Sequence, residues 1–379
     1  MTKKEQMIQM LETFVMMDSG SYDKSGVDRL GSLLIDTYRS IGYEETVYKQ
    51  DVYGDHILLR QKTNTQESSI LLLAHMDTVF PVGTAISRPF TIDGDYAYGP
   101  GVADMKGSHV TTFFALRELY ETHPDLLRHI DVLLTSDEEI GAVSARPYIE
   151  QHAQRKKAVL VMEPARKDGS VVTFRRGGGR YTMKVEGIAA HSGNDPEKGA
   201  SAIEELAHKI IALHQLSDQE AGIHVNVGVI KGGTSVNTVA DYAEADIDIR
   251  ISTIEQAGEL EKAIHDIAKR NHVAQTKTTV EGGSTRPPMV RTEKTIQLYH
   301  LVKACGAQLG IEVKETASGG GSDASYTSAL GVPTIDGMGP IGGGFHSVEE
   351  LLFVPSLEER SNLLVNVMKH LLTRDAVFG

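Results

Sequence analysis

The sequence contains a single cysteine, Cys305. A disulfide within the chain and a cysteine-rich zinc module are therefore both excluded. The scarcity of cysteine also suits a reducing compartment, where structural disulfides are rare. Any metal ion must consequently be held by histidine, aspartate and glutamate side chains.

Long apolar runs are missing as well, and no stretch approaches the roughly 20 residues that a membrane-spanning helix needs. Residues 1–20 carry apolar side chains at helical spacing, which is typical of an amphipathic helix and not of a signal peptide. The net charge of −13 argues against nucleic acid and anionic membrane surfaces as partners. We therefore expect a soluble, cytoplasmic protein.

Several common catalytic motifs are also absent. The sequence has no H-E-x-x-H, no G-x-x-x-x-G-K-[ST], no C-x-x-C and no G-x-S-x-G. The glycine-rich segment 318–323 is able to cradle an anion, but a lone run of this kind is weak evidence.

The first part of the chain alternates between strand-like and helix-like patterns. With 379 residues the chain has room for two or three domains of about 150 residues each. Strand-like runs lie at 45–52, 56–59, 70–74, 130–135 and 158–162, and helical periodicity lies at 26–41, 106–121 and 143–151. This alternation predicts an α/β domain with a mostly parallel sheet flanked by helices.

The pattern changes over residues 177–286. Apolar and polar residues alternate at 180–187, 224–231, 242–252 and 275–281, with amphipathic helical patterns at 199–216 and 254–270. The order βαββαβ is that of a ferredoxin-like unit with a half-exposed antiparallel sheet. After Pro287-Pro288 the alternation of helix-like and strand-like patterns returns. We therefore predict a discontinuous domain, 1–176 and 287–379, with a second domain inserted at 177–286.

Histidine and carboxylate residues recur where predicted strands end or where the chain is rich in glycine. They are His75, Asp104, Glu138, Glu139, Glu163 and His346. Parallel strands expose their carboxyl ends at one edge of the sheet, so these side chains are predicted to converge there. Two histidines and three of these four carboxylates suit a pair of zinc ions and an activated water.

Two further features refine this prediction. Asp77 lies on the same side of an extended chain as His75, so its carboxylate can accept the second ring N–H of that histidine. Adjacent Glu138 and Glu139 repel each other unless a cation neutralises one of them. One can then ligate a metal while the other takes a proton from water. The competing interpretation is a structural histidine at a strand end and a solvated acidic turn.

At these residues the sequence resembles the zinc exopeptidase family that holds carboxypeptidase G (glutamate carboxypeptidase), aminoacylase and succinyl-diaminopimelate desuccinylase. The resemblance spans the chain in order. It is carried by Asp18-Ser19-Gly20-Ser21, His75-Met76-Asp77-Thr78-Val79, segment 99–107, segment 137–141, Met162-Glu163-Pro164, Ala190-His191-Ser192-Gly193, segment 318–323 and His346-Ser347. Tyr98-Gly99-Pro100-Gly101 and the segment 319–323 resemble the glutamate carboxypeptidase branch most.

The resemblance implies a role for each residue of the set. Glu138 would act as the general base, and Asp77 would orient His75. Two zinc ions per subunit are implied, with cobalt or manganese as substitutes. The implied ligands are His75 and Glu163 for one ion, Glu139 and His346 for the other, and Asp104 as the bridge between them.

The chain can be compared with this family in more detail at two positions. The family's bridging aspartate typically precedes a cis peptide bond, so the resemblance implies a cis bond between Asp104 and Met105. Met105 departs from the family, which often has aspartate there. Glu163, where some dipeptidase relatives carry aspartate, favours the carboxypeptidase, aminoacylase and desuccinylase side.

The resemblance also implies that the inserted domain acts as a lid and forms a homodimer. His191 matches a histidine that reaches a neighbouring subunit's active site and stabilises the oxyanion. Arg286 matches an arginine that binds the substrate's terminal carboxylate, which suits its planar fork. Asn237 and Gly320 are further substrate-binding candidates. The alternatives are a helix-capping loop around His191 and a surface arginine near the domain boundary.

Together the residues and the resemblance predict a two-zinc amidohydrolase. It would cleave an amide bond next to a free carboxylate in a small peptide or N-acyl amino acid, as a glutamate-type carboxypeptidase does. An N-acyl-amino-acid deacylase and a desuccinylase are rivals that share every proposed catalytic residue. The non-enzyme rival is a catalytically silent, metal-dependent binding protein, and the presence of Glu138 argues against it.

Overall fold

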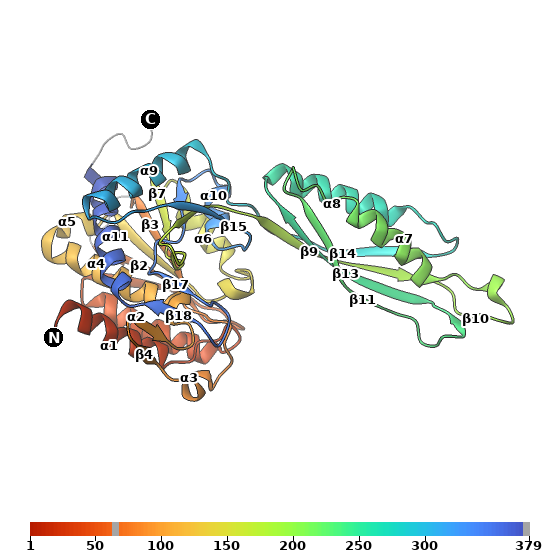
Figure 1. Ribbon diagram of the computed structural model, residues 1–379, viewed down its shortest axis with the longest axis horizontal. Helices are drawn as coiled ribbons and strands as arrows, with labels where there is room; N and C mark the ends of the chain where they lie inside the picture. The colour runs from red at the N-terminus through yellow and green to blue at the C-terminus, as the bar shows by residue number, and fades with distance from the viewer. Residues whose placement is uncertain (63–67, 374–379) are drawn as a thin grey trace. The chain divides into compact units, whose positions relative to one another are not determined.

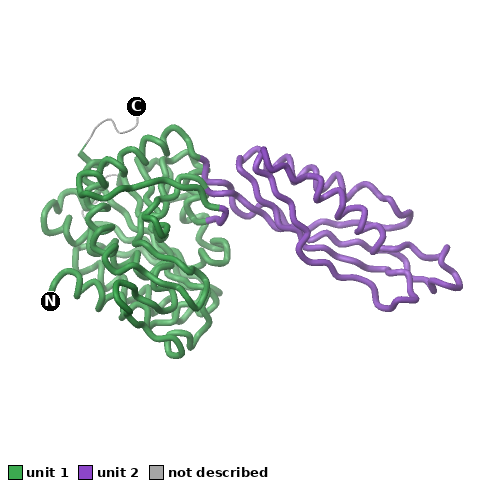
Figure 2. Tube along the Cα trace, in the orientation of Figure 1, with its two compact units in different colours: residues 1–174, 291–318, 322–379 green, residues 175–290, 319–321 purple. Residues whose placement is uncertain are grey.

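The computed structural model describes residues 1–62 and 68–373, which divide into two compact units (Figure 2). Unit 1 holds the described residues of 1–174, 291–318 and 322–379, and unit 2 holds 175–290 and 319–321. Unit 2 thus extends beyond the predicted insertion, 177–286, at both ends. It also includes the glycine segment 319–321. Arg175 accounts for that segment, because its Nη1 donates to the carbonyl oxygens of Gly320 and Gly321 at 3.1 and 3.2 Å.

A six-stranded sheet forms the centre of unit 1 (Figure 1). β3 is parallel to both β6 and β7, and β7 is parallel to β16, whereas β1 and β2 add an antiparallel edge. The α/β class with a mostly parallel sheet is therefore confirmed. In spatial order the strands are β1 (Tyr43–Tyr48), β2 (His56–Gln61), β6 (Ile130–Thr135), β3 (Ile70–His75), β7 (Ala158–Val161) and β16 (Thr334–Ile335).

Helices flank this sheet, and α1, α4 and α11 pack against one another. The helices of unit 1 are α1 (Lys3–Val15), α2 (Lys24–Arg39), α3 (Thr84–Ser87), α4 (Gly107–Thr122), α5 (Pro124–Leu127), α6 (Arg146–Ala153), α9 (Glu293–Gln308), α10 (Ala324–Ala329) and α11 (Pro355–Thr373). Within the described residues, no helix is both long and apolar enough to cross a membrane.

β3 is buried along its whole length, as a central parallel strand should be. Ile70, Leu72 and Ala74 belong to the large hydrophobic core, while the intervening Leu71 and Leu73 are buried as well. Since successive side chains point to opposite faces, both faces of the strand are covered. His75, the last residue of β3, is thereby delivered to the carboxyl edge of the sheet.

Two smaller sheets complete unit 1. β17 (Gly342–Gly343), β18 (Leu351–Phe353), β5 (Tyr96–Tyr98) and β4 (Thr91–Asp93) form an antiparallel sheet, and β15 (Glu315–Ser318) pairs with β8 (Val171–Arg175). The first of these sheets matters most for the site. β5 leads into the loop that carries Asp104, and β17 leads directly to His346.

Unit 2 is an antiparallel sheet in the order β11-β13-β9-β14. Its elements run β9 (Gly177–Glu186), β10 (Ala190–His191), α7 (Ala202–His214), β11 (His224–Gly232), β12 (Thr238–Val239), β13 (Tyr242–Ile251), α8 (Ile254–Lys269) and β14 (Lys277–Arg286). Apart from the short pair β10 and β12, this is the predicted βαββαβ order with the ferredoxin-like strand arrangement.

The core of unit 2 lies between its sheet and its two helices. In β13 the buried residues Ala243, Ala245, Ile247, Ile249 and Ile251 alternate with more exposed ones, and α7 and α8 contact the sheet. The sheet is therefore apolar on one face, in contrast to the central sheet of unit 1.

A buried ion pair joins the two helical segments of unit 2. Lys209 Nζ lies 2.9 Å from Glu205 Oε1 and donates to the carbonyl oxygens of Ile267, Ala268 and Arg270. Every proton of the buried ammonium group therefore meets an acceptor. The pair connects α7 to the end of α8.

Candidate metal centre

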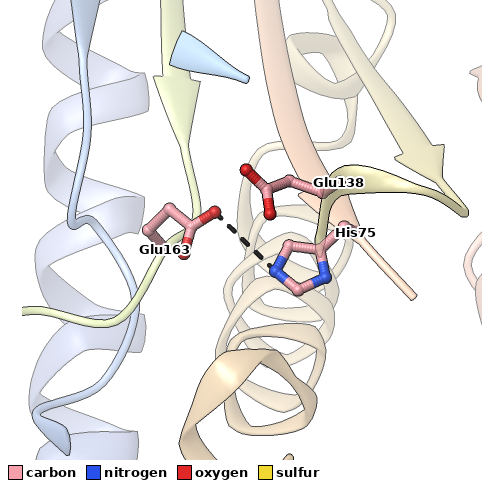
Figure 3. Close-up of side chains that lie close together, drawn as sticks. All are labelled: His75, Glu138 and Glu163. Atoms are coloured by element: carbon pink, nitrogen blue, oxygen red, sulfur yellow. Dashed lines mark ion pairs between the residues drawn. The ribbon is translucent and has the colours of Figure 1, made fainter. Parts of the chain in front are cut away.

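Three strands of the central sheet bring candidate ligands to one edge. His75 of β3 lies opposite Thr135 of β6, and Leu73 of β3 lies opposite Val161 of β7. The turn after β6 carries Glu138 and Glu139, and the segment after β7 carries Glu163. In Figure 3 the side chains of His75, Glu138 and Glu163 point toward a common space.

Asp104 reaches the cluster by a different route from the one predicted, and His346 follows a glycine-rich segment. Asp104 was expected to follow a strand of the parallel sheet, but it lies in the loop between β5 of the smaller sheet and α4. His346 lies just beyond β17 of the same smaller sheet. The peptide bond between Asp104 and Met105 is cis, as the resemblance implied.

Asp104 lies between the two histidines. Its Oδ1 is 3.1 Å from His75 Nε2, and its Oδ2 is 3.4 Å from His346 Nε2. Two more carboxylates complete the set, with Glu139 Oε2 3.0 Å from His346 Nε2 and Glu163 Oε1 3.7 Å from His75 Nε2. Asp104 thus contacts both imidazoles. Each imidazole also contacts a second carboxylate, Glu163 for His75 and Glu139 for His346.

The potential ligand atoms are close enough to hold metal ions. Atoms of His75, Glu138 and Glu163 lie within 4.8 Å of one another, and so do atoms of His75, Asp104 and Glu139. Imidazole nitrogen and carboxylate oxygen are ligands that zinc accepts. The donor set therefore fits a metal centre, with Glu138 at its side.

Negative charge is concentrated in this cluster. Burial, reinforced by the charge of Asp104, raises the pKa of Glu163 well above its usual range and that of Glu139 to about 8. Hydrogen bonds to Asp104 and Glu139 raise the pKa of His346 to about 11. Burial alone would raise the pKa of Asp104, but His346 and His75 hold it below its usual value. Carboxylates packed this closely favour bound cations.

Asp77 supports both His75 and the acidic turn. His75 Nδ1 donates to the carbonyl oxygen of Asp77 at 2.9 Å, and the carboxylate that was predicted as its acceptor is farther away, at 3.4 Å. The Asp77 carboxylate also accepts the backbone N–H groups of Glu138 and Glu139 at 3.1 and 3.2 Å, and the Ser21 hydroxyl at 2.7 Å. With Nδ1 directed at this carbonyl oxygen, Nε2 of His75 faces the other candidate ligands.

Glu350 is a supporting residue that the sequence analysis missed. It accepts the backbone N–H groups of Gly101, Ala103 and Asp104, each at 3.0 Å. The carboxylate is buried, and burial raises its pKa to about 7. Glu350 stands four residues after His346, so one segment presents a candidate ligand and holds the loop that carries another. Its proximity to His346 was the only signal in the sequence.

His109 is a second residue that the sequence analysis missed. Its Nε2 donates to the carbonyl oxygen of His75 at 2.8 Å. Burial lowers the pKa of His109 to about 3, so the ring stays neutral at physiological pH. His109 therefore holds the end of β3 in place.

A comparison with protein families identifies the chain. A model of peptidase family M20/M25/M40 matches residues 71–370, a range that contains the whole cluster. The chain belongs to this family. The family resemblance predicted from the sequence is thereby confirmed.

Two curated relatives show the range of reactions in this family. Carboxypeptidase G2 of Pseudomonas sp. (strain RS-16) is 29% identical over 350 residues, which cover 90% of the chain and 83% of that protein. A succinyl-diaminopimelate desuccinylase of Stenotrophomonas maltophilia (strain R551-3) is 30% identical over 346 residues, which cover 84% and 89%. The M20-family chain is therefore a hydrolase of a metallopeptidase and amidohydrolase family.

Solved structures support the same fold. A tripeptidase from Staphylococcus aureus subsp. aureus Mu50 has a TM-score of 0.81 at 20% identity, covering 98% of this chain and 99% of that one. The YXEP protein of Bacillus subtilis, described as a dinuclear metal binding peptidase from the M20 family, has a TM-score of 0.70 at 14% identity and covers 98% and 99%. At these identities the likeness extends to the fold alone.

Two of the predicted M20-family site residues lie together in unit 2. His191 of β10 pairs with Thr238 of β12, and the amide of Ser192 donates to the carbonyl oxygen of Asn237 at 3.0 Å. His191 is exposed, and its Nδ1 accepts the N–H groups of Gly193 and Asn194 at 3.1 and 3.2 Å. A neutral ring with Nδ1 as acceptor carries its proton on Nε2. That N–H is available as a donor.

Arg286 and Gly320 lie in a second part of unit 2. Arg286 ends β14, and a Cβ atom on Gly321 would come within 2.9 Å of its Cδ and 3.2 Å of its Nη1. Glycine at 321 therefore lets the arginine side chain lie against the backbone. Gly320 accepts the hydrogen bond from Arg175 at 3.1 Å. The roles of these four residues in unit 2 remain predictions.

Proposed function

We propose that this M20-family hydrolase is a two-zinc carboxypeptidase that releases a C-terminal amino acid, with glutamate as the preferred residue. The observation that carries the proposal is the position of Asp104, whose two carboxylate oxygens each face one histidine. A carboxylate in that position is suited to bridge two metal ions.

The metal assignment follows the pairs of residues in the cluster. His75 and Glu163 would hold one zinc ion, His346 and Glu139 the other, and Asp104 would contact both. Cobalt or manganese would be accepted by the same nitrogen and oxygen donors. Zinc bound there supplies Lewis-acid polarisation of the scissile carbonyl and a water of lowered pKa.

Glu138 is the proposed general base. Its carboxylate is buried within 4.8 Å of ligand atoms of His75 and Glu163, and Asp77 fixes its backbone N–H. Glu138 takes one proton from the attacking water as the new C–O bond forms. It then gives that proton to the leaving nitrogen as the C–N bond breaks, which balances the proton count of the hydrolysis.

Residues of unit 2 are proposed to act on the substrate. His191 would donate its Nε2–H to the oxyanion that develops on the carbonyl oxygen. Arg286 would bind the free carboxylate of the leaving amino acid, with Asn237 and Gly320 as further contacts. A homodimer formed through unit 2, and a cytoplasmic location, belong to the same proposal.

The test is release of free amino acid from a panel of N-acyl and peptidyl amino acids, with added zinc and with a chelator. Zinc content is measured on the same samples. The expected result is chelator-sensitive release confined to C-terminal glutamate. Release from simple N-acetyl amino acids of any side chain would assign the enzyme to the deacylases, and release from N-succinyl-diaminopimelate would assign it to the desuccinylases. No release from any of these substrates, with zinc bound, would contradict the proposal and favour a silent binding protein.

A further inference from the structure

His56 is a buried histidine of unit 1 that the proposed mechanism does not use. It is the first residue of β2, and its side chain is fully buried. Its neighbour Ile57 lies opposite Leu134 of β6, so His56 stands beside the end of β6, where the chain turns toward Glu138. Buried polar atoms are almost always hydrogen-bonded, so the partners of the two ring nitrogens indicate what the ring holds in place.

The ring of His56 contacts the chain on both sides of the acidic turn, residues 137–143, which carries Glu138 and Glu139. Nδ1 lies 3.0 Å from the hydroxyl oxygen of Ser136, which precedes the turn. Nε2 lies 3.0 Å from the hydroxyl oxygen of Ser144, which follows the turn. One rigid ring therefore bridges the two ends of the acidic turn.

The direction of the hydrogen bonds can be assigned at Ser136. Its hydroxyl donates its only proton to the carbonyl oxygen of Gly54 at 2.5 Å, because a carbonyl oxygen can only accept. Nδ1 of His56 must then be the donor to the Ser136 oxygen. Ser136 is thus held by a backbone group and a side-chain group of the segment that enters β2.

Asp137 closes the bridge at the other end. Its Oδ2 accepts the backbone N–H of Ser144 and lies 2.8 Å from the Ser144 hydroxyl oxygen. Asp137 and Ser136 are both fully buried, as His56 is. The base of the acidic turn is therefore closed by a continuous set of polar groups from Ser136 through His56 and Ser144 to Asp137.

The backbone of the acidic turn is sharply bent. Ala142 has a φ of 53°, which is uncommon for a residue with a side chain, and Gly141 before it has a φ of 101°. Residues in such conformations persist only where their surroundings fix them, and they are frequent at active sites. The N–H of Ala142 donates to the carbonyl oxygen of Asp137 at 2.8 Å, so the bend closes on a residue that the bridge also holds.

We infer that His56 is a positioning residue for Glu138 and acts through Ser136 and Ser144 at the base of the acidic turn. The inference rests on the proposed function, in which Glu138 is the general base. Asp77 holds the N–H of Glu138 at 3.1 Å, and His56 adds the constraint that joins the two ends of the turn. A reacting group that is misplaced by about 1 Å loses on the order of 100-fold in rate.

His56→Phe tests this role, because phenylalanine fills the space of the ring but offers neither nitrogen. At saturating zinc, kcat for release of C-terminal glutamate is expected to fall about 100-fold, with KM unchanged. His152→Phe is the matched control. His152 is also buried and, like His56, contacts the stacked rings of Tyr48 and Tyr148, but its described hydrogen bond is to Tyr48 and not to the acidic turn. Its variant should keep the wild-type kcat.

A double-mutant cycle and a partial rescue test whether the bridge acts as a unit. Ser144→Ala combined with His56→Phe should lower kcat no further than His56→Phe alone, since both changes break the same bridge. Effects that multiply would overturn the inference. His56→Asn retains an amide donor near the position of Nδ1, so its kcat should exceed that of His56→Phe by about tenfold, roughly the contribution of one hydrogen bond. Equal kcat in these two variants would overturn the role of the Ser136 contact.

Hydrogen exchange separates failure of the bridge from failure of the reaction. Amide exchange of a peptide that spans the acidic turn is measured by mass spectrometry on the full-length, zinc-supplemented protein without substrate. His56→Phe is expected to speed this exchange about tenfold and His152→Phe to leave it unchanged. That result would support the bridge even if no substrate is cleaved, in which case only the proposed function fails. Unchanged exchange in His56→Phe would overturn the inference, and so would faster exchange with a wild-type kcat.

Discussion

The metal cluster of unit 1 and the candidate substrate residues of unit 2 are held in very different ways. His75, Asp104 and Glu163 are buried, and hydrogen bonds hold the ring of His75 and the backbone of Asp104 in place. His191 and Asn237 are exposed, and their described hydrogen bonds are with residues of the two segments around β10 and β12. Unit 1 therefore holds its candidate metal ligands in fixed positions, whereas the candidate substrate residues of unit 2 lie at the surface.

The sheets of the two units also differ in how their strands are buried. β3 is buried on both faces, while β13 alternates between buried and more exposed residues. A strand covered on both sides orients the residue at its end rigidly, and a one-sided sheet leaves its loops in solvent. The comparison agrees with the proposal that the chemistry takes place in unit 1 while residues of unit 2 contact the substrate.

The largest effect is expected at Glu138. Glu138→Gln removes the proposed base and should lower kcat by about 1,000-fold while metal content stays unchanged. Its neighbour is the matched comparison, because Glu139→Gln should lower the metal content itself. Metal analysis and kcat on both variants separate the two roles. Loss of metal from Glu138→Gln would reassign Glu138 as a ligand.

A smaller effect is expected at His191, and it tests the role of unit 2. His191→Asn keeps an acceptor for the amides of Gly193 and Asn194 but removes the Nε2–H, so kcat should fall about 100-fold with metal content unchanged. His208→Ala provides the control, since His208 is another exposed histidine of unit 2 that stacks on His272. Wild-type turnover in His191→Asn would show that the ring only anchors its loop.

The smallest of the three effects is expected at Glu350. Glu350→Gln replaces one acceptor oxygen by an NH₂ group that faces backbone N–H groups, so the loop carrying Asp104 should loosen. Metal affinity is expected to fall about 10–100-fold. Competition with a chromophoric chelator measures this, and Glu349→Gln, at an exposed position, should leave affinity unchanged. Equal affinity in the two variants would limit Glu350 to a structural role.

Much of the architecture was predictable from local patterns. The apolar runs at 70–74 and 130–135 correspond to β3 (Ile70–His75) and β6 (Ile130–Thr135), and the helix predicted at 106–121 corresponds to α4 (Gly107–Thr122). These elements were predictable because the spacing of apolar residues in the sequence reflects which faces of a helix or strand are buried. The ferredoxin-like order of unit 2 was readable for the same reason.

The arrangement around Asp77 and Asp104 was less predictable. The sequence analysis assigned the Asp77 carboxylate to His75, from whose Nδ1 it lies 3.4 Å, but missed that it also holds the backbone of the Glu138–Glu139 turn. Asp104 arrives from the smaller sheet and not from a parallel strand. Both outcomes depend on contacts between segments far apart in the chain, which residue spacing does not encode.

The sequence by itself determined the elements, the types of ligand and the family of this chain, because periodicity and the ordered motifs depend only on neighbouring residues. The tertiary structure alone decided which atom of each candidate ligand faces which partner, and that Glu350 accepts hydrogen bonds from the loop that carries Asp104. The physical reason is that the direction of these contacts arises only when residues from distant segments are packed together.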